Sequence, residues 1–193
     1  MSKKKISLKD ISFIIPTNRD KIYTLESIPP ECPIYIEREG NDYQARNKGI
    51  KKAKTDIVIV CDDDIKFSKE FLEFVLSKME ENTLVGLEDY YPMRWCITRF
   101  MCFWKKDWER VGGFDESRKG YGGPDTDFCI RMEKAGVKII RLPRDSVEHV
   151  YPEKKRPAIK ELSVLLYLLR RHPRQMIIPA FKLIFRKITG IEL

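Results

Sequence analysis

The stretch T-D-I-V-I-V-C-D-D-D-I, residues Thr55 to Ile65, decides how this chain is organised. Its four consecutive β-branched residues, Ile57 to Val60, follow no helical period, and such a run is typical of a strand buried on both faces in a parallel sheet. Three carboxylates, Asp62, Asp63 and Asp64, come directly after it. Because adjacent negative charges repel one another, we expect them where the strand leaves the sheet and where they can share a cation. The stretch therefore predicts a central strand that ends in an acidic cluster.

In an open α/β sheet, ligands bind beyond the carboxyl ends of the strands, which is where these carboxylates are predicted to lie. Hard oxygen ligands suit Mg²⁺ or Mn²⁺, usually together with the phosphates of a substrate. The alternative for three consecutive aspartates is a solvated acidic turn, and the apolar strand before them argues against it. The cluster is therefore predicted to hold a divalent metal ion and to contact a phosphorylated ligand.

The composition is that of a globular protein, because 42% of the 193 residues are hydrophobic. The five cysteines are an odd number without a Cys-x-x-Cys pair, which favours reduced thiols over a disulfide framework or a zinc site. The first residues, M-S-K-K-K-I-S-L, are basic but lack the apolar segment of a signal peptide, and no stretch approaches the length of a membrane span. We therefore expect a cytoplasmic location.

Strands and helices alternate along the first half of the chain. A first strand is predicted over Ile11 to Pro16, and the polar loop Thr17 to Asp20 after it is expected to face a ligand. A second strand is predicted over Pro33 to Glu39, and a helix over Tyr43 to Lys54 leads into the central strand. A further helix, capped by Ser68, follows the acidic cluster. This order indicates an α/β fold.

The second half begins with two β-prone runs, Thr83 to Gly86 and Arg94 to Trp104. The loop Lys119 to Asp127 then holds three glycines and a proline, so its backbone can approach a ligand closely. Asp125 stands in this loop at the start of a helix, where it is either a helix cap or a catalytic group. The last predicted strand is V-K-I-I-R-L-P, from Val137. His149 follows it, and a lone histidine of this kind is either structural or a ligand of the nearby metal.

Four motifs, taken in order, resemble those of family 2 glycosyltransferases with the GT-A fold. They are I-I-P-T-N-R-D from Ile14, A-R-N-K-G-I-K-K-A-K-T-D-I-V-I-V-C-D-D-D from Ala45, G-G-F-D-E from Gly112, and Y-G-G-P-D-T-D-F-C-I-R-M from Tyr121. The resemblance covers about residues 10 to 152. It implies a Rossmann-like α/β fold with a mostly parallel central sheet flanked by helices, and a catalytic domain over residues 1–152.

The resemblance also implies roles for individual side chains. In that family an Asp-x-Asp element holds the metal and the nucleotide, which corresponds to Asp62 and Asp64 here. The carboxylate of the glycine-rich loop is the general base, which implies this role for Asp125, with Asp127 capping the helix or orienting the base. A histidine after the last strand is often a further metal ligand, which corresponds to His149.

Contacts to a nucleotide-sugar donor are implied mainly for residues that follow the first two strands or lie beside the acidic cluster. The implied donor contacts are Pro16, Thr17, Asn18, Arg19, Glu37, Glu39, Arg46, Asn47, Asp62 and Asp63. For Arg46 and Asn47 the alternative is an ordinary solvent-facing helix. The sequence departs from the family pattern at Pro124, where a glutamate commonly precedes the base, and in E-R-E-G-N-D, which replaces the usual D-D-G-S context. Glu37 and Glu39 are therefore alternatives for recognising the nucleobase.

Sugar transfer from a nucleotide diphosphate requires a stabilised leaving group and an activated hydroxyl. A metal ion, Mn²⁺ or Mg²⁺, stabilises the departing diphosphate of a UDP- or GDP-sugar as a Lewis acid. A single carboxylate base at the acceptor, Asp125, predicts inversion at the anomeric carbon.

Residues 153–193 are predicted to form a basic, amphipathic helical tail. From residue 151 onward, ten Lys or Arg stand against three Glu, a net charge of +7 out of +8 for the chain. Basic amphipathic helices lie in membrane interfaces and are drawn to anionic lipid, and the alternative is packing on the catalytic domain or on a second subunit. The predicted apolar stripes are Ile159, Leu162, Leu165, Leu166 and Leu169, and then Ile177, Phe181, Ile184 and Ile188.

Together these features predict a metal-dependent, inverting glycosyltransferase at the cytoplasmic face of a membrane, with a lipid-linked glycan or a polyprenyl phosphate as acceptor. A nucleotidyltransferase would use the same metal and carboxylates but would leave Asp125 without a task. A nucleic-acid-binding module explains neither the acidic cluster nor the glycine-rich loop, so no nucleic-acid partner is expected. A homodimer through the tail is the alternative to membrane contact.

Overall fold

A computed structural model describes residues 6–118, 122–151 and 158–190. The strands of its main sheet are β1 (Ile11–Pro16), β2 (Ile34–Glu37), β3 (Ile57–Cys61), β5 (Thr83–Glu88), β6 (Cys96–Trp104) and β7 (Lys138–Leu142). A second, two-stranded sheet joins β4 (Ile65–Lys66) to β8 (Glu148–His149). The helices are α1 (Asp42–Lys52), α2 (Lys69–Lys78), α3 (Lys105–Val111), α4 (Pro124–Lys134), α5 (Ala158–Arg171) and α6 (Pro173–Thr189). Short 3-10 helices are η1 (Leu8–Asp10), η2 (Tyr23–Ser27) and η3 (Arg144–Ser146).

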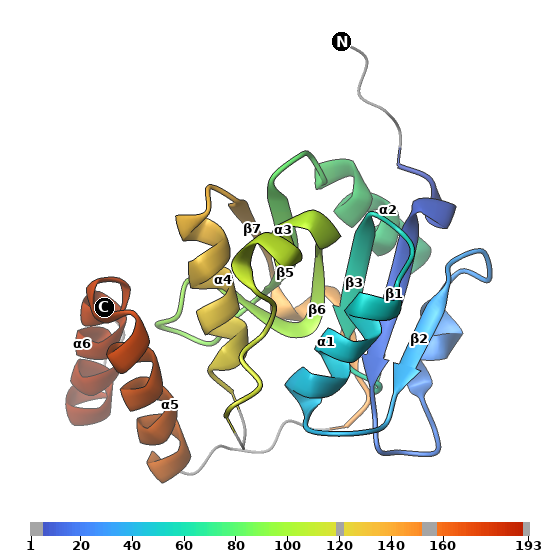
Figure 1. The fold of residues 1–193 in the computed structure, drawn as a ribbon. Coiled ribbons are helices and arrows are strands. Elements are labelled where there is room, and N and C mark those ends of the chain that lie inside the picture. Colours follow the sequence, from blue (N-terminus) through green and yellow to red (C-terminus); the bar gives the residue numbers. More distant parts are fainter. Residues whose placement is uncertain (1–5, 119–121, 152–157, 191–193) are drawn as a thin grey trace.

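The main sheet has the strand order β2-β1-β3-β6-β5-β7, with helices packed against it (Figure 1). All its strand pairs are parallel except those that β6 makes with β3 and β5. The residues that join β5 to β6 are too few for the crossover that a parallel pair requires, so β6 runs antiparallel. The predicted α/β fold with a mostly parallel sheet is confirmed.

The sheet is buried on both faces, as the apolar strands predict. In β3, Val58 and Val60 point into one hydrophobic cluster, whereas Ile57, Ile59 and Cys61 point into the other. This alternation follows from the period of two in a strand. The first cluster is covered by α1, α3 and α4, and the second by α2 and by Ile22 and Ile28, which flank η2. All five cysteines are free and buried, in agreement with the expectation of reduced thiols.

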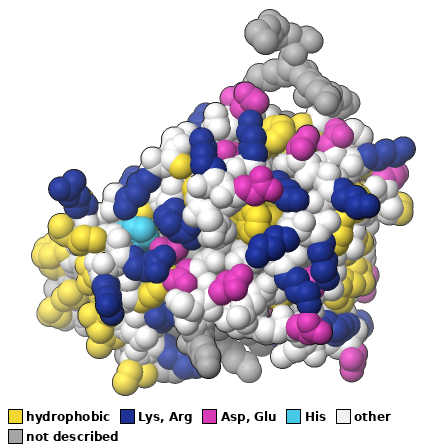
Figure 2. Space-filling view, in the orientation of Figure 1, with side chains coloured by type: hydrophobic (Ala, Val, Ile, Leu, Met, Phe, Trp, Pro, Cys, Tyr) yellow, Lys and Arg dark blue, Asp and Glu magenta, His cyan; other side chains and the backbone are white. Residues whose placement is uncertain are grey.

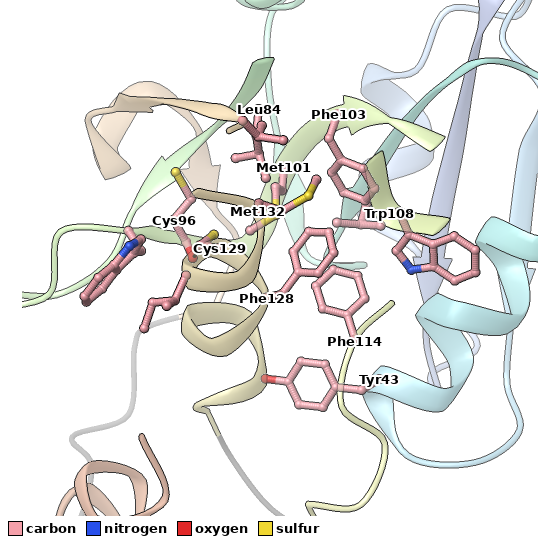
Figure 3. Packing of buried hydrophobic residues seen from close by; sticks show 14 of the residues in the cluster. Tyr43, Leu84, Cys96, Met101, Phe103, Trp108, Phe114, Phe128, Cys129 and Met132 are labelled. Atoms are coloured by element: carbon pink, nitrogen blue, oxygen red, sulfur yellow. Dashed lines mark hydrogen bonds between the residues drawn. The ribbon is translucent and has the colours of Figure 1, made fainter. Parts of the chain in front are cut away.

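Aromatic rings from separate elements meet in the first cluster (Figure 3). The Phe114 and Phe128 ring centroids are 4.2 Å apart, and those of Phe103 and Phe128 are 5.3 Å apart. Tyr43 reaches the same group from α1. Since Phe128 belongs to α4 and Tyr43 to α1, this packing fixes the two helices that carry Asp125 and Arg46.

The two C-terminal helices, α5 and α6, form an antiparallel pair beside α4 (Figure 1), and we call this pair the C-terminal hairpin. One side of the hairpin belongs to the first hydrophobic cluster, where Leu168 and Met176 are fully buried and Leu165 is 4% exposed. Leu165 and Leu169, predicted on the same stripe as Leu166, therefore pack inward. The predicted domain boundary between residues 152 and 153 lies outside the described residues.

Removal of one inward side chain of the hairpin is expected to destabilise the whole protein. Leu168→Ala removes a fully buried side chain and leaves a cavity, so the free energy of unfolding should fall by about 2–5 kcal/mol. Leu166→Ala is the matched control, since Leu166 lies on the same helix and is 58% exposed, and its effect should stay within about 0.5 kcal/mol. Urea unfolding measures both values. Equal effects would show that the hairpin does not share the core.

Among the helices within the described ranges, none combines the length and the apolar character needed to cross a bilayer.

Candidate active site

The carboxyl ends of three neighbouring parallel strands gather most of the predicted site residues. β1 lies between β2 and β3, and Pro16 at its end is paired with Glu37. Thr17 and Arg19 follow β1, and the three aspartates follow β3. The acidic cluster therefore lies at the sheet edge where the sequence predicts it.

Asp62 faces a buried arginine of α1. The Nη2 atom of Arg46 donates to Asp62 Oδ1 at 2.7 Å, and the Arg46 side chain is 5% exposed. The Arg46 Nε is buried without a hydrogen-bond partner among the described residues. Because a buried guanidinium needs a compensating anion, this pair holds the end of β3 against α1. Asp62 thus contacts a cation of the protein, and its predicted role as a metal ligand stays a prediction.

Asp63 and Asp64 share one arginine from the first loop. Arg19 Nη1 is 2.8 Å from both Asp63 Oδ1 and Asp64 Oδ2, and its hydrogen bond to Asp64 raises the pKa of the guanidinium. Thr17 Oγ1 also donates to Asp63. The Arg19 guanidinium lies 4.8 Å from the centroid of the Tyr151 ring. The two carboxylates therefore share a guanidinium of the protein, and the predicted binding of a metal ion at this point stays a prediction.

The small sheet brings His149 to the acidic cluster. Ile65, next to Asp64, is paired with His149, and the Val150 N–H donates to the Asp64 carbonyl at 2.9 Å. These contacts place His149 Nε2 3.3 Å from Asp64 Oδ1. The Nδ1 atom faces the Tyr151 carbonyl, so the ring is oriented with Nε2 toward the carboxylate. Two residues that are far apart in the sequence thus present an oxygen and a nitrogen to one point.

These two side chains are suited to bind a divalent metal ion whose remaining ligands come from the substrate. Within the described residues, no group of three or more His, Cys, Asp or Glu is arranged to hold a metal ion. Mg²⁺ and similar ions in phosphoryl sites are usually held by one or two protein ligands together with substrate phosphates and water. Asp64 Oδ1 and His149 Nε2 meet that requirement, and their side chains are 10% and 22% exposed, so a ligand can reach them.

Asp125 is held at the start of α4 by backbone groups. Its Oδ1 accepts hydrogen bonds from the N–H groups of Gly123 at 3.1 Å and Thr126 at 3.0 Å. Gly123 itself has a φ of 103°, a conformation that side-chain-bearing residues avoid, so the tight turn before the helix depends on glycine. Among the described residues, Oδ2 makes no hydrogen bond that would occupy it. The carboxylate is thus fixed through one oxygen while the other is available.

Tyr43 contacts the arginine that holds Asp62. Its ring centroid lies 5.6 Å from the Arg46 guanidinium carbon, and Arg46 in turn binds Asp62. Burial raises the pKa of the Tyr43 hydroxyl, and the charge of Asp125 raises it further. Tyr43 therefore stays neutral between the two carboxylates.

Asn47 has a structural role, and its predicted contact with the donor stays a prediction. Its Oδ1 accepts from Trp108 Nε1 at 3.0 Å and from the Phe114 N–H at 2.9 Å, while its Nδ2 donates to the Phe114 carbonyl and to Glu116. All hydrogen-bonding positions of the amide are therefore used in holding the segment after α3 against α1.

The two acids after β2 lie in different surroundings. Glu37 is 4% exposed, and its Oε1 accepts from Lys52 at 2.5 Å, so it is enclosed beneath α1. The Glu39 side chain is 82% exposed and pairs with Lys48 at 2.6 Å. Asn18 and Arg19 lie exposed in the loop after β1. Of the two acids, only Glu39 is accessible to a ligand without rearrangement.

Asp127 connects α4 to the C-terminal hairpin. This role differs from the predicted one as a helix cap. Its fully buried carboxylate accepts from Arg131 at 2.8 and 2.9 Å, from Arg171 Nε at 2.7 Å and from His172 Nε2 at 2.8 Å. Although burial would raise the pKa of Asp127, these cationic and hydrogen-bonding partners lower it. Burial lowers the pKa of His172, and Lys134 Nζ lies 3.1 Å from its Nδ1. A neutral His172 that donates from Nε2 satisfies both contacts.

A second set of contacts joins α5 to the segments on either side of the glycine-rich loop. Tyr167 donates to Asp115 Oδ2 at 2.7 Å, and Arg171 lies 3.1 Å from the same oxygen. Although burial raises the pKa of Asp115, these partners lower it to about 2. A Cβ added at Gly123 would lie 3.0 Å from the Tyr167 ring. The turn at Gly123, just before Asp125, therefore lies against α5.

Comparison with known proteins agrees with this geometry. Residues 84–156, which include Asp125 and His149, match the family described as the N-terminal domain of galactosyltransferase. An uncharacterised glycosyltransferase of Bacillus subtilis, YwdF, is 23% identical over 165 residues, which are 69% of this chain and 60% of the relative. A mouse N-acetyl-β-glucosaminyl-glycoprotein 4-β-N-acetylgalactosaminyltransferase 1 is 28% identical over 142 residues, which are 63% of this chain and 14% of the relative. The chain thus spans less than two thirds of the length of either relative.

The fold is shared with solved glycosyltransferase structures. Drosophila β1,4-galactosyltransferase 7 in complex with xylobiose has a TM-score of 0.57 at 16% identity, covering 79% of this chain and 78% of that one. The chain therefore has the GT-A fold. A mutant of the Drosophila protein in complex with manganese, UDP-Gal and xylobiose gives a TM-score of 0.58 at 14% identity over the same shares.

A mannosyltransferase of Pyrobaculum calidifontis in complex with GDP-Man and Mn²⁺ also shares this fold. The TM-score is 0.59 at 16% identity, covering 89% of this chain and 64% of that one. The family found by comparison is the galactosyltransferase one, so the more specific resemblance to family 2 is not confirmed.

Sequence reasoning missed several residues of the GT-A domain site. Tyr151 stacks on Arg19, and Arg99 of β6 lies beside Asp62, whose N–H donates to the Arg99 carbonyl. Arg99 has one detectable signal, since it is a charged residue inside an apolar strand and is 9% exposed. Asp115 lies in the motif G-G-F-D-E, but its contact with Tyr167 carries no sequence signal, because it depends on how α5 packs.

Proposed function

We propose that the domain transfers a sugar from a nucleotide-diphosphate donor to a hydroxyl acceptor with the help of a divalent metal ion. The observation that carries this proposal is the meeting of Asp64 and His149 at the carboxyl end of β3. When bound, the metal would supply Lewis-acid stabilisation of the departing diphosphate. An imidazole ligand favours Mn²⁺ over Mg²⁺, and Mn²⁺ accompanies the nucleotide sugar in two of the similar structures.

The protein's own residues prepare the site for an anionic donor. Arg19 lies beside Asp63 and Asp64 with its side chain 44% exposed, where it can contact a diphosphate. Arg46 holds Asp62 in place from within the domain. The loop Pro16 to Arg19 borders the same sheet edge and is proposed to contact the donor, with Glu39 as the accessible acid after β2.

Asp125 is proposed to accept the proton of the acceptor hydroxyl. Its Oδ1 is held by two backbone N–H groups, and the free Oδ2 is the basic atom. With one carboxylate acting on the acceptor, the hydroxyl attacks the anomeric carbon directly, so the sugar is transferred with inversion. Similar structures bind UDP-Gal or GDP-Man, which favours sugar transfer over nucleotidyl transfer.

We also propose that the acceptor hydroxyl belongs to a glycan. Xylobiose is bound in the Drosophila structures, which supports a glycan acceptor. We further propose that a lipid carries this glycan at the cytoplasmic face of a membrane. The basic C-terminal hairpin beside the glycine-rich loop supports this part of the proposal.

A donor screen tests the proposed activity. The chain is incubated with UDP-Gal, GDP-Man and other UDP- and GDP-sugars in Mn²⁺, Mg²⁺ or EDTA, and the released nucleoside diphosphate is measured. At least one donor should be hydrolysed in Mn²⁺ and none in EDTA. Release that continues in EDTA would contradict the metal dependence, and the absence of release from every donor would contradict the proposed function.

A further inference from the structure

The C-terminal hairpin has an apolar surface that the protein leaves uncovered. Six side chains form what we call the outer face, and each is 52–78% exposed. They are Ile159, Leu162 and Leu166 of α5 and Ile177, Phe181 and Ile184 of α6. Figure 2 shows hydrophobic side chains gathered at the side of the molecule where α5 and α6 lie. A contiguous exposed surface of this kind marks an interaction site.

The outer face is distinct from the side that packs on the domain. In α5, Leu166 points outward while Leu165 and Leu168 are buried, and in α6, Ile177 points outward while Met176 is fully buried. Substitutions on the outer face therefore leave the core contacts intact. Removal of the entire hairpin would also remove the core side, so the outer face must be tested by single side chains.

Basic side chains lie within this apolar surface. Arg170 follows Leu166 by four residues and Arg174 precedes Ile177 by three, so both share the outer face of their helices, and both are exposed. Lys160 is exposed near the start of α5. Glu161 is the sole acidic residue of the two helices, and it is neutralised by Lys187 at 2.7 Å. Within the part of the chain that the structure describes, the outer face therefore combines apolar and positive groups without an opposing charge.

We infer that the outer face docks on an anionic lipid surface. Apolar side chains enter the interface while Arg170 and Arg174 meet negatively charged headgroups. A second copy of the chain fits less well, because a symmetric contact between two outer faces would bring the arginines of both copies together.

The outer face lies next to the glycine-rich loop that carries Asp125. Arg118, just before the glycine-rich loop, donates from Nη2 to Ser163 Oγ at 3.1 Å, and Ser163 directly follows Leu162 of the outer face. Tyr167 of the same helix contacts Gly123. A lipid surface at the outer face would thus place a lipid-linked acceptor beside Asp125. This placement of the acceptor rests on the proposed function, whereas docking itself does not.

Vesicle co-sedimentation of the full chain tests the apolar part of the proposal. The probes are vesicles of phosphatidylcholine with or without phosphatidylglycerol. Wild type should bind the anionic vesicles, and Ile177→Gln/Phe181→Gln should bind at least about tenfold more weakly, since each change replaces apolar contact area. Phe74→Gln is the matched control, because Phe74 is 48% exposed on α2, and its binding should stay within twofold of wild type. Equal binding by the outer-face variant would overturn the proposal.

The charge part has its own pair of variants. Arg170→Gln/Arg174→Gln should weaken binding about fivefold per removed charge, and high salt should weaken wild type similarly. Lys54→Gln/Lys138→Gln removes the same net charge from exposed positions elsewhere and should have little effect. Equal binding to neutral vesicles, or a soluble dimer that the outer-face variant dissociates, would overturn the lipid assignment.

Melting temperatures close to that of wild type are expected for all these variants, because the replaced side chains are exposed. Donor hydrolysis in Mn²⁺ should also be unchanged. For the wild type, hydrolysis without any binding to anionic vesicles would therefore refute docking alone, and vesicle binding without any hydrolysis would refute the proposed function alone.

Discussion

Replacement of Asp125 with asparagine is expected to slow sugar transfer by at least about 100-fold, because general-base catalysis contributes on the order of 10²–10⁴. Asparagine keeps the shape of the side chain, and its amide oxygen can still accept the hydrogen bonds from Gly123 and Thr126. The turn before α4 should therefore persist while the basic oxygen is lost. The rate of transfer is measured at saturating donor and acceptor, and the melting temperature is measured alongside it.

The donor affinity of the Asp125→Asn variant separates catalysis from structure. If Asp125 acts only on the acceptor, donor binding should remain close to that of wild type. Near-wild-type transfer would show that Asp125 only caps α4. Retention of anomeric configuration in the product, read by NMR, would contradict direct attack by the acceptor.

Asp64→Ala is expected to reduce transfer by on the order of 10³-fold or more, because it removes a proposed metal ligand and with it several kcal/mol of leaving-group stabilisation. The remaining Asp63 still pairs with Arg19, so the loop after β1 should stay in place. The measurement is the initial rate as a function of Mn²⁺ concentration.

Asp56→Ala is the matched control for Asp64→Ala. Asp56 is an exposed carboxylate directly before β3, at the end of the strand opposite the acidic cluster. Its removal changes the net charge equally but leaves the proposed site intact, so the rate should stay within about twofold of wild type. A comparable loss in both variants would mean that net charge, and not a metal ligand, accounts for the effect.

The longer strands and the acidic cluster were predictable from local sequence alone. The run Ile57 to Val60 contains no polar residue, so it predicts a buried strand. The aspartates after it indicate where the strand ends, and no information about neighbouring elements is needed. The strand over Ile11 to Pro16 is bounded in the same way by a proline and a polar loop. Local patterns of this kind depend on burial and on the period of two, both of which the sequence carries.

Pairings between distant residues were not predictable in the same way. His149 reaches Asp64 because β8 pairs with β4, and two-residue strands have no recognisable hydrophobic pattern. Asn47 lies on α1 as predicted, yet its amide is consumed by partners that only the packing of α3 brings near. The direction of β6 likewise depends on a short connection rather than on its composition.

The C-terminal hairpin shows why the alternatives drawn from its composition do not exclude one another. Both helices were expected from their apolar periodicity, and the question was whether lipid or protein covers them. Leu168 and Met176 pack on the domain, whereas Leu166 and Phe181 remain outside. Asp127 decides the orientation, because its buried carboxylate binds Arg171 and His172 and fixes which side faces inward. No sequence pattern indicates that a buried carboxylate in α4 pairs with Arg171 and His172 at the end of α5.

Binding of Mn²⁺ in the presence of UDP or GDP, followed by the loss of the free-ion electron paramagnetic resonance signal, tests the central claim most directly. Wild type and Asp56→Ala should bind the ion together with at least one of the two nucleotides, and Asp64→Ala should not. Equal binding by Asp64→Ala and wild type, or no binding by wild type with either nucleotide, would contradict a metal–diphosphate site at the end of β3.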